Sequence, residues 1–109
     1  MISATIRSLG ARLVVAAALS LYLGSAHAEE LKVTIDNFTF TPAELKVKVG
    51  DTVTWTNHDD IPHTVVAAGK YRSKTMDTDG TFSFTFTSAG DYKYFCSLHP
   101  HMTGTVKVE

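Results

Sequence analysis

The sequence has very little of three features that define whole classes of protein. It contains a single cysteine in 109 residues, which excludes an intrachain disulfide framework. Its 10 basic and 11 acidic side chains nearly cancel, so there is no strongly positive charge to bind nucleic acid. A chain of 109 residues holds one domain, which excludes a two-domain enzyme.

Residues 1–28 have the three-part pattern of a secretory signal peptide. Arg7 and Arg12 supply a positive start, an apolar run follows, and Ala26-His27-Ala28 places small residues at a signal-peptidase site. The alternative is a membrane anchor, but the apolar run is about half of the roughly 20 residues that span a bilayer. We therefore predict a Sec-type signal, export to the periplasm and a mature domain of residues 29–109.

The remaining chain alternates between apolar and polar residues, which is the period of half-buried β-strands. The clearest runs are Leu31–Ile35, Leu45–Val49, Val53–Trp55, Phe82–Phe86, Tyr92–Cys96 and Val106–Val108. Turn-forming pairs such as Gly50-Asp51 and Asp79-Gly80 separate them. This pattern predicts an all-β protein, an antiparallel sandwich of short strands. The irregular segment Gly69–Asp79 is expected to be a solvated connection, with Met76 as an apolar gap-filler rather than a ligand.

Three metal-binding side chains follow one another at equal spacing in the segment Cys96–Met102. Cys96, His99 and Met102 are three residues apart, between two predicted strands. Thiolate and thioether are soft ligands and imidazole is borderline, so the set favours copper over magnesium or calcium. Zinc is the competing metal, but its sites combine Cys and His with carboxylates rather than with Met. A blue-copper site also needs a second imidazole from elsewhere in the chain.

His63 is the candidate for that second imidazole, because it follows Pro62 at the start of an apolar run. Within the loop, His101 is the alternative to His99. Its direct neighbour is Met102, and adjacent residues of a tight loop rarely point at one ion, so we favour His99. A lone cysteine is most often a small buried hydrophobe, but the joint occurrence of all these residues favours a metal site.

These motifs resemble the cupredoxins, the type 1 blue-copper proteins. Amicyanins within that family have the same Cys-x2-His-x2-Met spacing, whereas pseudoazurin and plastocyanin have a longer one. The resemblance implies a single-domain Greek-key sandwich of seven to eight strands with one Cu(I)/Cu(II) ion near one end. His63, Cys96 and His99 would be the strong ligands and Met102 the long axial one. Thr64 stands where the family often has Asn, and its hydroxyl would brace the ligand loop.

The resemblance also implies an electron-transfer protein rather than an enzyme, since four protein ligands leave no open position for a substrate. A redox enzyme, such as an amine dehydrogenase, and a c-type cytochrome would exchange electrons at the edge of His99. They would dock on a patch that contains Pro62, Leu98, Pro100 and His101. We expect a monomer that binds neither nucleic acid nor, once the signal is removed, the membrane. The alternative is a periplasmic protein that handles copper without electron transfer.

Overall fold

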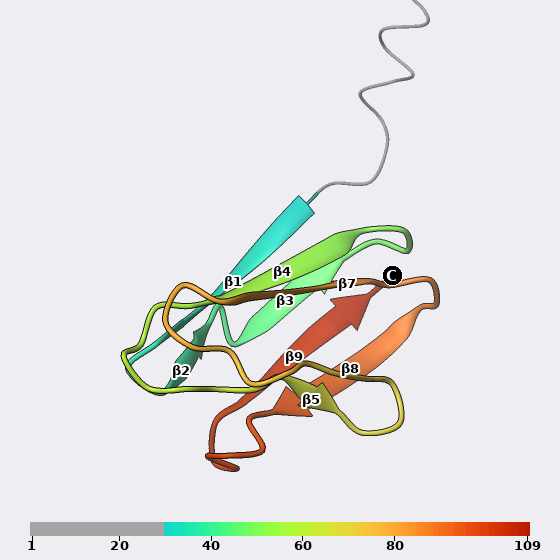
Figure 1. The fold of residues 1–109 in the computed structure, drawn as a ribbon. Coiled ribbons are helices and arrows are strands. Elements are labelled where there is room, and N and C mark those ends of the chain that lie inside the picture. The colour runs from blue at the N-terminus through green and yellow to red at the C-terminus, as the bar shows by residue number, and fades with distance from the viewer. Residues whose placement is uncertain (1–29) are drawn as a thin grey trace, which may run out of the picture.

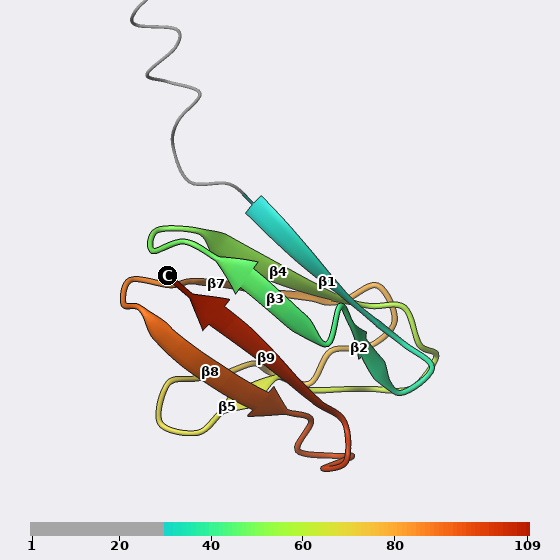
Figure 2. The ribbon, with the colours of Figure 1, turned by 180° about the vertical axis from the view of Figure 1, so that it is seen from behind.

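The computed structural model describes residues 30–109 as two β-sheets that pack face to face (Figures 1 and 2). One sheet has the strand order β2-β1-β4-β7 and the other the order β3-β9-β8-β5-β6. The strands are β1 (Glu30–Asp36), β2 (Thr39–Thr41), β3 (Glu44–Val47), β4 (Thr52–Asn57), β5 (Val66–Ala67), β6 (Tyr71–Arg72), β7 (Thr81–Thr85), β8 (Gly90–Phe95) and β9 (Thr103–Val108). The prediction of an all-β sandwich is confirmed.

The described residues hold nine strands rather than the expected seven to eight. Strands β5 and β6 have two residues each, too short to show an alternation in the sequence. Strand β3 belongs to the sheet opposite its neighbours β2 and β4, so the chain crosses between the sheets as in a Greek key. Two pairings, β1 with β4 and β3 with β9, are parallel, so the prediction of a purely antiparallel sandwich was wrong in this respect. The predicted signal peptide lies outside the described residues.

Alternation along β4 decides which side chains enter the core. Val53 and Trp55 are fully buried between the sheets. Thr52 and Thr54 lie on the outer face, where their hydroxyls form 2.7 Å hydrogen bonds to hydroxyls of β7. Apolar residues of both sheets complete the core, including Val33, Ile35, Phe40, Tyr71, Phe86, Tyr94 and Val106. The sequence period therefore corresponds to burial on one face and hydroxyl pairing on the other.

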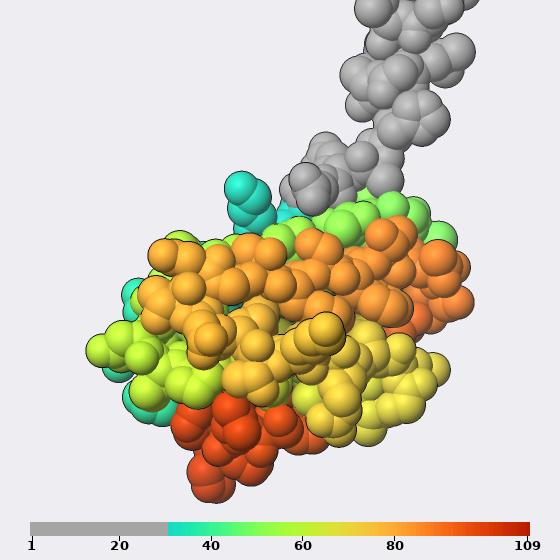
Figure 3. All heavy atoms as spheres, viewed as in Figure 1, coloured from blue at the N-terminus to red at the C-terminus, as the bar shows by residue number. Residues whose placement is uncertain are grey.

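The segment that joins β6 to β7 corrects the prediction of a solvated connection. Its residues Ser73 and Met76 are buried, as is Tyr71 before them. The Ser73 N–H donates to the carbonyl of Val65 at 2.8 Å, so the segment extends the pairing of β5 and β6. Figure 3 shows this yellow and gold segment on the front face of the molecule. The partial burial of this segment is not evident from the sequence because one of its inward-facing residues, Ser73, is polar.

No helix occurs among residues 30–109, so this part of the chain contains no helix long and apolar enough to cross a membrane.

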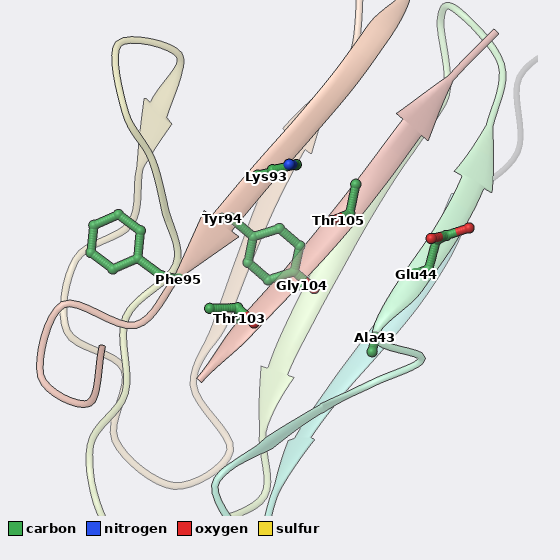
Figure 4. Close-up of a pocket in the computed structure, with 8 residues that line it drawn as sticks. All are labelled: Ala43, Glu44, Lys93, Tyr94, Phe95, Thr103, Gly104 and Thr105. Atoms are coloured by element: carbon green, nitrogen blue, oxygen red, sulfur yellow. The ribbon is translucent and has the colours of Figure 1, made fainter. Parts of the chain in front are cut away.

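Gly104 of β9 lies against the ring of Tyr94 (Figure 4). A Cβ at this position would overlap the hydroxyl oxygen and Cζ of that ring. Tyr94 is buried, and its ring packs against those of Phe40 and Trp55, so moving it away from a new Cβ would disturb these contacts. We expect Gly104→Ala to lower the free energy of unfolding by about 1–3 kcal/mol, measured by chemical denaturation. In a Tyr94→Ala background the same change should cost far less, and an equal cost in both backgrounds would contradict this explanation.

Candidate metal centre

Three potential ligand atoms meet at the end of the sandwich where β8 leads into β9. His63 Nδ1 lies 3.8 Å from Cys96 Sγ and 3.2 Å from His99 Nδ1. Cys96 Sγ lies 3.6 Å from His99 Nδ1, and all three atoms are within 4.8 Å of one another. His63 and Cys96 are fully buried, whereas His99 is partly exposed. The structure therefore brings together a thiol and two imidazoles that the sequence separates by up to 36 residues.

The equal spacing in the loop corresponds to two consecutive turns. The His99 N–H donates to the carbonyl of Cys96 at 3.2 Å, and the Met102 N–H donates to the carbonyl of His99 at 2.9 Å. The Cys96 N–H closes the loop by donating to the carbonyl of Met102 at 3.1 Å. Such i to i+3 bonds close successive β-turns, so every third residue occupies an equivalent position in the loop.

The remaining candidate ligands are two buried methionines and one exposed histidine. Met102 is buried at the end of the second turn, and Met76 is buried opposite His63, with which it forms an isolated antiparallel bridge. Burial therefore does not distinguish the two methionines, whereas the position of Met102 in the ligand loop does. His101 is exposed and is not one of the three converging groups.

Thr64 connects the segment that carries His63 to the loop that carries Cys96. Its hydroxyl accepts a 2.8 Å hydrogen bond from the Ser97 N–H and lies 2.8 Å from the Ser97 hydroxyl. Its own backbone N–H points at Cys96 Sγ at 3.4 Å. Thr64 thus makes the cross-loop bonds between the His63 segment and the Cys96 loop.

Asp59 determines which nitrogen of His63 faces the centre. Its Oδ1 accepts a 2.6 Å hydrogen bond from the Asn37 N–H, and its Oδ2 accepts a 3.0 Å bond from the Phe38 N–H. Oδ2 also lies 2.7 Å from His63 Nε2. Because both carboxylate oxygens already accept bonds, Nε2 donates in this pair. The lone pair of His63 Nδ1 then faces Cys96, which is the tautomer that a metal ligand requires.

Phe38 covers the two imidazoles from the solvent side. Asn37 and Phe38 have φ angles of 50° and 57°, a left-handed turn in which the backbone N–H groups of both residues donate to Asp59. The Phe38 ring meets the rings of His63 and His99 edge-on, at centroid distances of 5.5 and 5.1 Å. It remains 46% exposed, so it forms part of the surface around the centre.

The surroundings lower the pKa values of the Cys96 thiol and the Asp59 carboxyl group and so favour their charged forms. Burial raises the pKa of Cys96, but the Thr64 N–H and hydroxyl and the adjoining rings of His63 and His99 together outweigh it, and the pKa falls to about 6. The hydrogen bond from the Phe38 N–H is the largest influence on Asp59, whose pKa falls to about 2 although burial opposes this. The thiolate, which is the form that binds metal, is therefore available at neutral pH.

Sequence reasoning missed Asp59 and Phe38. Asp59 stands four residues before His63 in the pair Asp59-Asp60, which by itself indicates only a turn. Phe38 lies 25 positions before His63, just after the alternating run Leu31–Ile35. The preceding Asn37, a residue type that tolerates a positive φ, is the one local sign of a turn there. Only the tertiary contacts show that these residues adjoin the centre.

The donor set fits copper rather than a hard cation. A thiolate and two imidazole nitrogens converge, and no carboxylate belongs to the converging group among the described residues. Such a set suits copper or zinc, and a thioether at the end of the same loop distinguishes copper.

A family model described as "Copper binding proteins, plastocyanin/azurin family" matches residues 27–109. The chain belongs to this family. The family and the donor set agree on copper as the cofactor, with one ion for each chain. The resemblance to cupredoxins seen in the sequence is thereby confirmed.

Two amicyanins are similar in sequence to this cupredoxin. The amicyanin of Paracoccus denitrificans is 41% identical over 71% of this chain and 63% of its own length. The amicyanin of Paracoccus versutus is 36% identical over 75% of this chain and 67% of its own length. The chain therefore spans about two thirds of the length of these relatives.

Two solved structures have the same fold. An oxidised amicyanin variant superimposes with a TM-score of 0.70 at 42% identity, over 73% of this chain and 82% of that one. A purple cupredoxin from Nitrosopumilus maritimus superimposes with a TM-score of 0.68 at 32% identity, over 72% and 99% of the two chains.

The Asp59 contacts give a prediction about copper affinity. Asp59→Asn replaces an acceptor oxygen with an amide nitrogen and removes the charge that holds the His63 tautomer. We expect copper affinity to fall by about 10- to 100-fold, the usual effect of losing a residue that orients a metal ligand. Competition with a copper chelator measures it.

Asp60→Asn is the matched control for this prediction. It removes the same charge from the neighbouring residue, which is exposed and makes no hydrogen bond or ion pair in the part of the chain that the structure describes. Equal losses of affinity in the two variants would show that net charge, and not the hydrogen bond to His63, is responsible.

Proposed function

We propose that this cupredoxin is an electron carrier whose copper is held by His63, Cys96, His99 and Met102. The convergence of one thiol sulfur and two imidazole nitrogens within 4.8 Å supports this assignment. Copper supplies the one-electron Cu(I)/Cu(II) couple when it is bound. His63 and Cys96 shield the centre because both are fully buried.

The surrounding residues restrict movement of the ligand side chains. Asp59 orients His63, and the hydroxyl of Thr64 joins the His63 segment to the loop of Cys96. A preorganised set of ligands suits electron transfer, in which the same residues must hold two oxidation states. Four protein ligands also leave no position for a substrate. Cupredoxins such as amicyanin are electron carriers and not enzymes, which agrees with this function.

The electron would leave through the partly exposed edge of His99. Leu98 is 48% exposed and Phe38 is 46% exposed, and Pro62 and Pro100 are exposed as well. These residues and the exposed His101 form an apolar patch around His99, in which Phe38 is an addition to the residues expected from the sequence. Patches of this kind suit brief encounters between redox proteins. A redox enzyme such as an amine dehydrogenase would be the donor, and a c-type cytochrome the acceptor.

The burial of the site gives less support to the alternative function, copper handling without electron transfer. A protein that delivers copper needs ligands that exchange easily with another protein. Cys96 has no exposed surface, and the carboxylate of Asp59 and the ring of Phe38 enclose His63. The burial of these groups favours retention of the ion.

The spectrum of the copper-loaded protein tests the ligand assignment. We expect an intense blue absorption when Cu(II) is added to the purified protein, because a short bond between copper and the Cys96 thiolate gives a strong charge-transfer band. Cys96→Ser should abolish the band, since a hydroxyl does not replace a thiolate. A weak, pale spectrum from the unmodified protein would refute a type 1 site.

Two matched pairs of variants assign the other ligands. His99→Ala should destroy the blue absorption whereas His101→Ala should keep it, because His101 lies outside the converging group. Met102→Leu should shift the reduction potential whereas Met76→Leu should not, although both methionines are 5% exposed. The reverse result in either pair would reassign that ligand.

We propose that the protein works in the periplasm as a monomer, and the signal-like sequence of residues 1–28 supports this location. Cleavage after Ala28 predicts that the exported protein begins at Glu29. N-terminal sequencing of the protein from a periplasmic extract measures this. Recovery of the intact chain from the membrane fraction would instead support a membrane anchor.

A further inference from the structure

Three exposed cations form a row on the segment that runs beside the metal centre. Arg72 and Lys74 flank the buried residue Ser73 on an extended stretch, so both project from the same side, and Lys70 is exposed in the turn that leads into this stretch. At about 3.3 Å per residue, Arg72 and Lys74 are roughly 7 Å apart along the chain. None of the three cations has an ion-pair partner within residues 30–109.

The row leads toward the end of the sandwich that holds the centre. The Ser73 N–H bonds to Val65, and Met76 forms its backbone bridge with His63. Lys74 is therefore about 7 Å along the chain from the residue that pairs with His63. In Figure 3 the yellow and gold segment lies on the same face as the red loop at the bottom. A partner attracted by the row would meet the apolar patch on the adjoining surface.

Positively and negatively charged side chains occupy separate stretches of this segment. The exposed Asp77 and Asp79 follow the three cations, and Asp79 lies 3.9 Å from His58. The whole chain has a formal charge of −1, so the row is a local exception on a weakly acidic protein. Separation of positive and negative charge along one face orients an approaching partner as well as attracting it.

Protection of a sheet edge is the competing explanation for the row. Strand β6 is the outer strand of the five-stranded sheet, and charged side chains on such strands prevent edge-to-edge aggregation. Charge of either sign meets that need. Attraction of a partner depends on positive charge, so charge reversal separates the two explanations.

We propose that Lys70, Arg72 and Lys74 form the docking surface for an acidic face of the protein that exchanges electrons with this cupredoxin. The inference rests on the proposed electron-transfer function and adds the chemistry of the partner, a redox protein whose centre is bordered by Asp and Glu. One electron passes between the two centres, and no bond forms or breaks. A lipid surface is a poorer occupant, because recognition of anionic membranes takes clusters of roughly four to eight cations.

Rates of reduction measured against salt concentration test the proposal. The electron donor is reduced plant-type ferredoxin, used as an acidic probe protein, and the acceptor is the copper-loaded protein. Reversing the row with K70E, R72E and K74E should slow this reaction by about tenfold at about 0.01 M salt, where the Debye length is roughly 30 Å. The difference should shrink to about twofold or less near 1 M salt, where that length is about 3 Å.

The matched control reverses Lys32, Lys46 and Lys48, which are exposed on β1, on β3 and just after β3. It has the same net charge and should slow the ferredoxin reaction by less than about threefold. Equal slowing by the two triple variants, or no slowing by the first, would overturn the proposal. No slowing in a row variant that elutes like the unmodified protein in gel filtration would leave edge protection as the role of the row.

A second reductant separates this proposal from the proposed function. Hexaammineruthenium(II), a small dication, should reduce the row variant at least as fast as the unmodified protein. Failure of the unmodified protein to accept an electron from it would remove the electron-transfer function itself. Slow reduction of the row variant by this dication would point to a damaged centre and overturn the docking role. Binding to phosphatidylglycerol vesicles that is lost in the row variant would make a lipid surface the occupant instead.

Discussion

The 2.7 Å hydrogen bond between His63 and Asp59 fixes the orientation of the buried imidazole at the metal centre. The same carboxylate accepts the backbone N–H groups of Asn37 and Phe38, so the turn after β1 depends on it as well. A fully buried imidazole needs a partner for each of its nitrogens, because an unpaired polar group is costly away from water. Asp59 satisfies one nitrogen of His63 and leaves the other for the metal.

Two sets of hydrogen bonds connect the oriented His63 to the loop that contains Cys96. Thr64 follows His63 directly, and its hydroxyl and N–H reach Ser97 and Cys96. The loop itself is closed by backbone bonds at both turns, so it arrives at the centre with its donors already arranged. The sheets behind it supply the support, since β8 and β9 are paired along their whole length. Low reorganisation at a redox centre follows from such a framework.

In the redox encounter that we propose, the centre and the cation row act through two different kinds of interaction. Apolar residues around His99 permit close approach and easy separation, because small apolar contacts are weak and non-directional. Charges act at longer range and determine the rate and orientation of approach. The segment from Lys70 to Met76 links the two, since its buried residues pack against the core while its exposed residues face solvent.

Local pattern in the sequence was enough to predict the sandwich, because alternation of period two is a property of each strand by itself. It was also enough to select Cys96, His99 and Met102, because two successive turns within seven residues place them without help from the rest of the fold. Pairing His63 with that loop required a hypothesis about which ends of strands meet. Only the tertiary structure shows that Asp59 and Phe38 lie beside the centre. The same is true of the partial burial of the segment after β6. These features arise through contacts between segments as many as 25 residues apart, and such contacts leave no periodic signal in a single sequence.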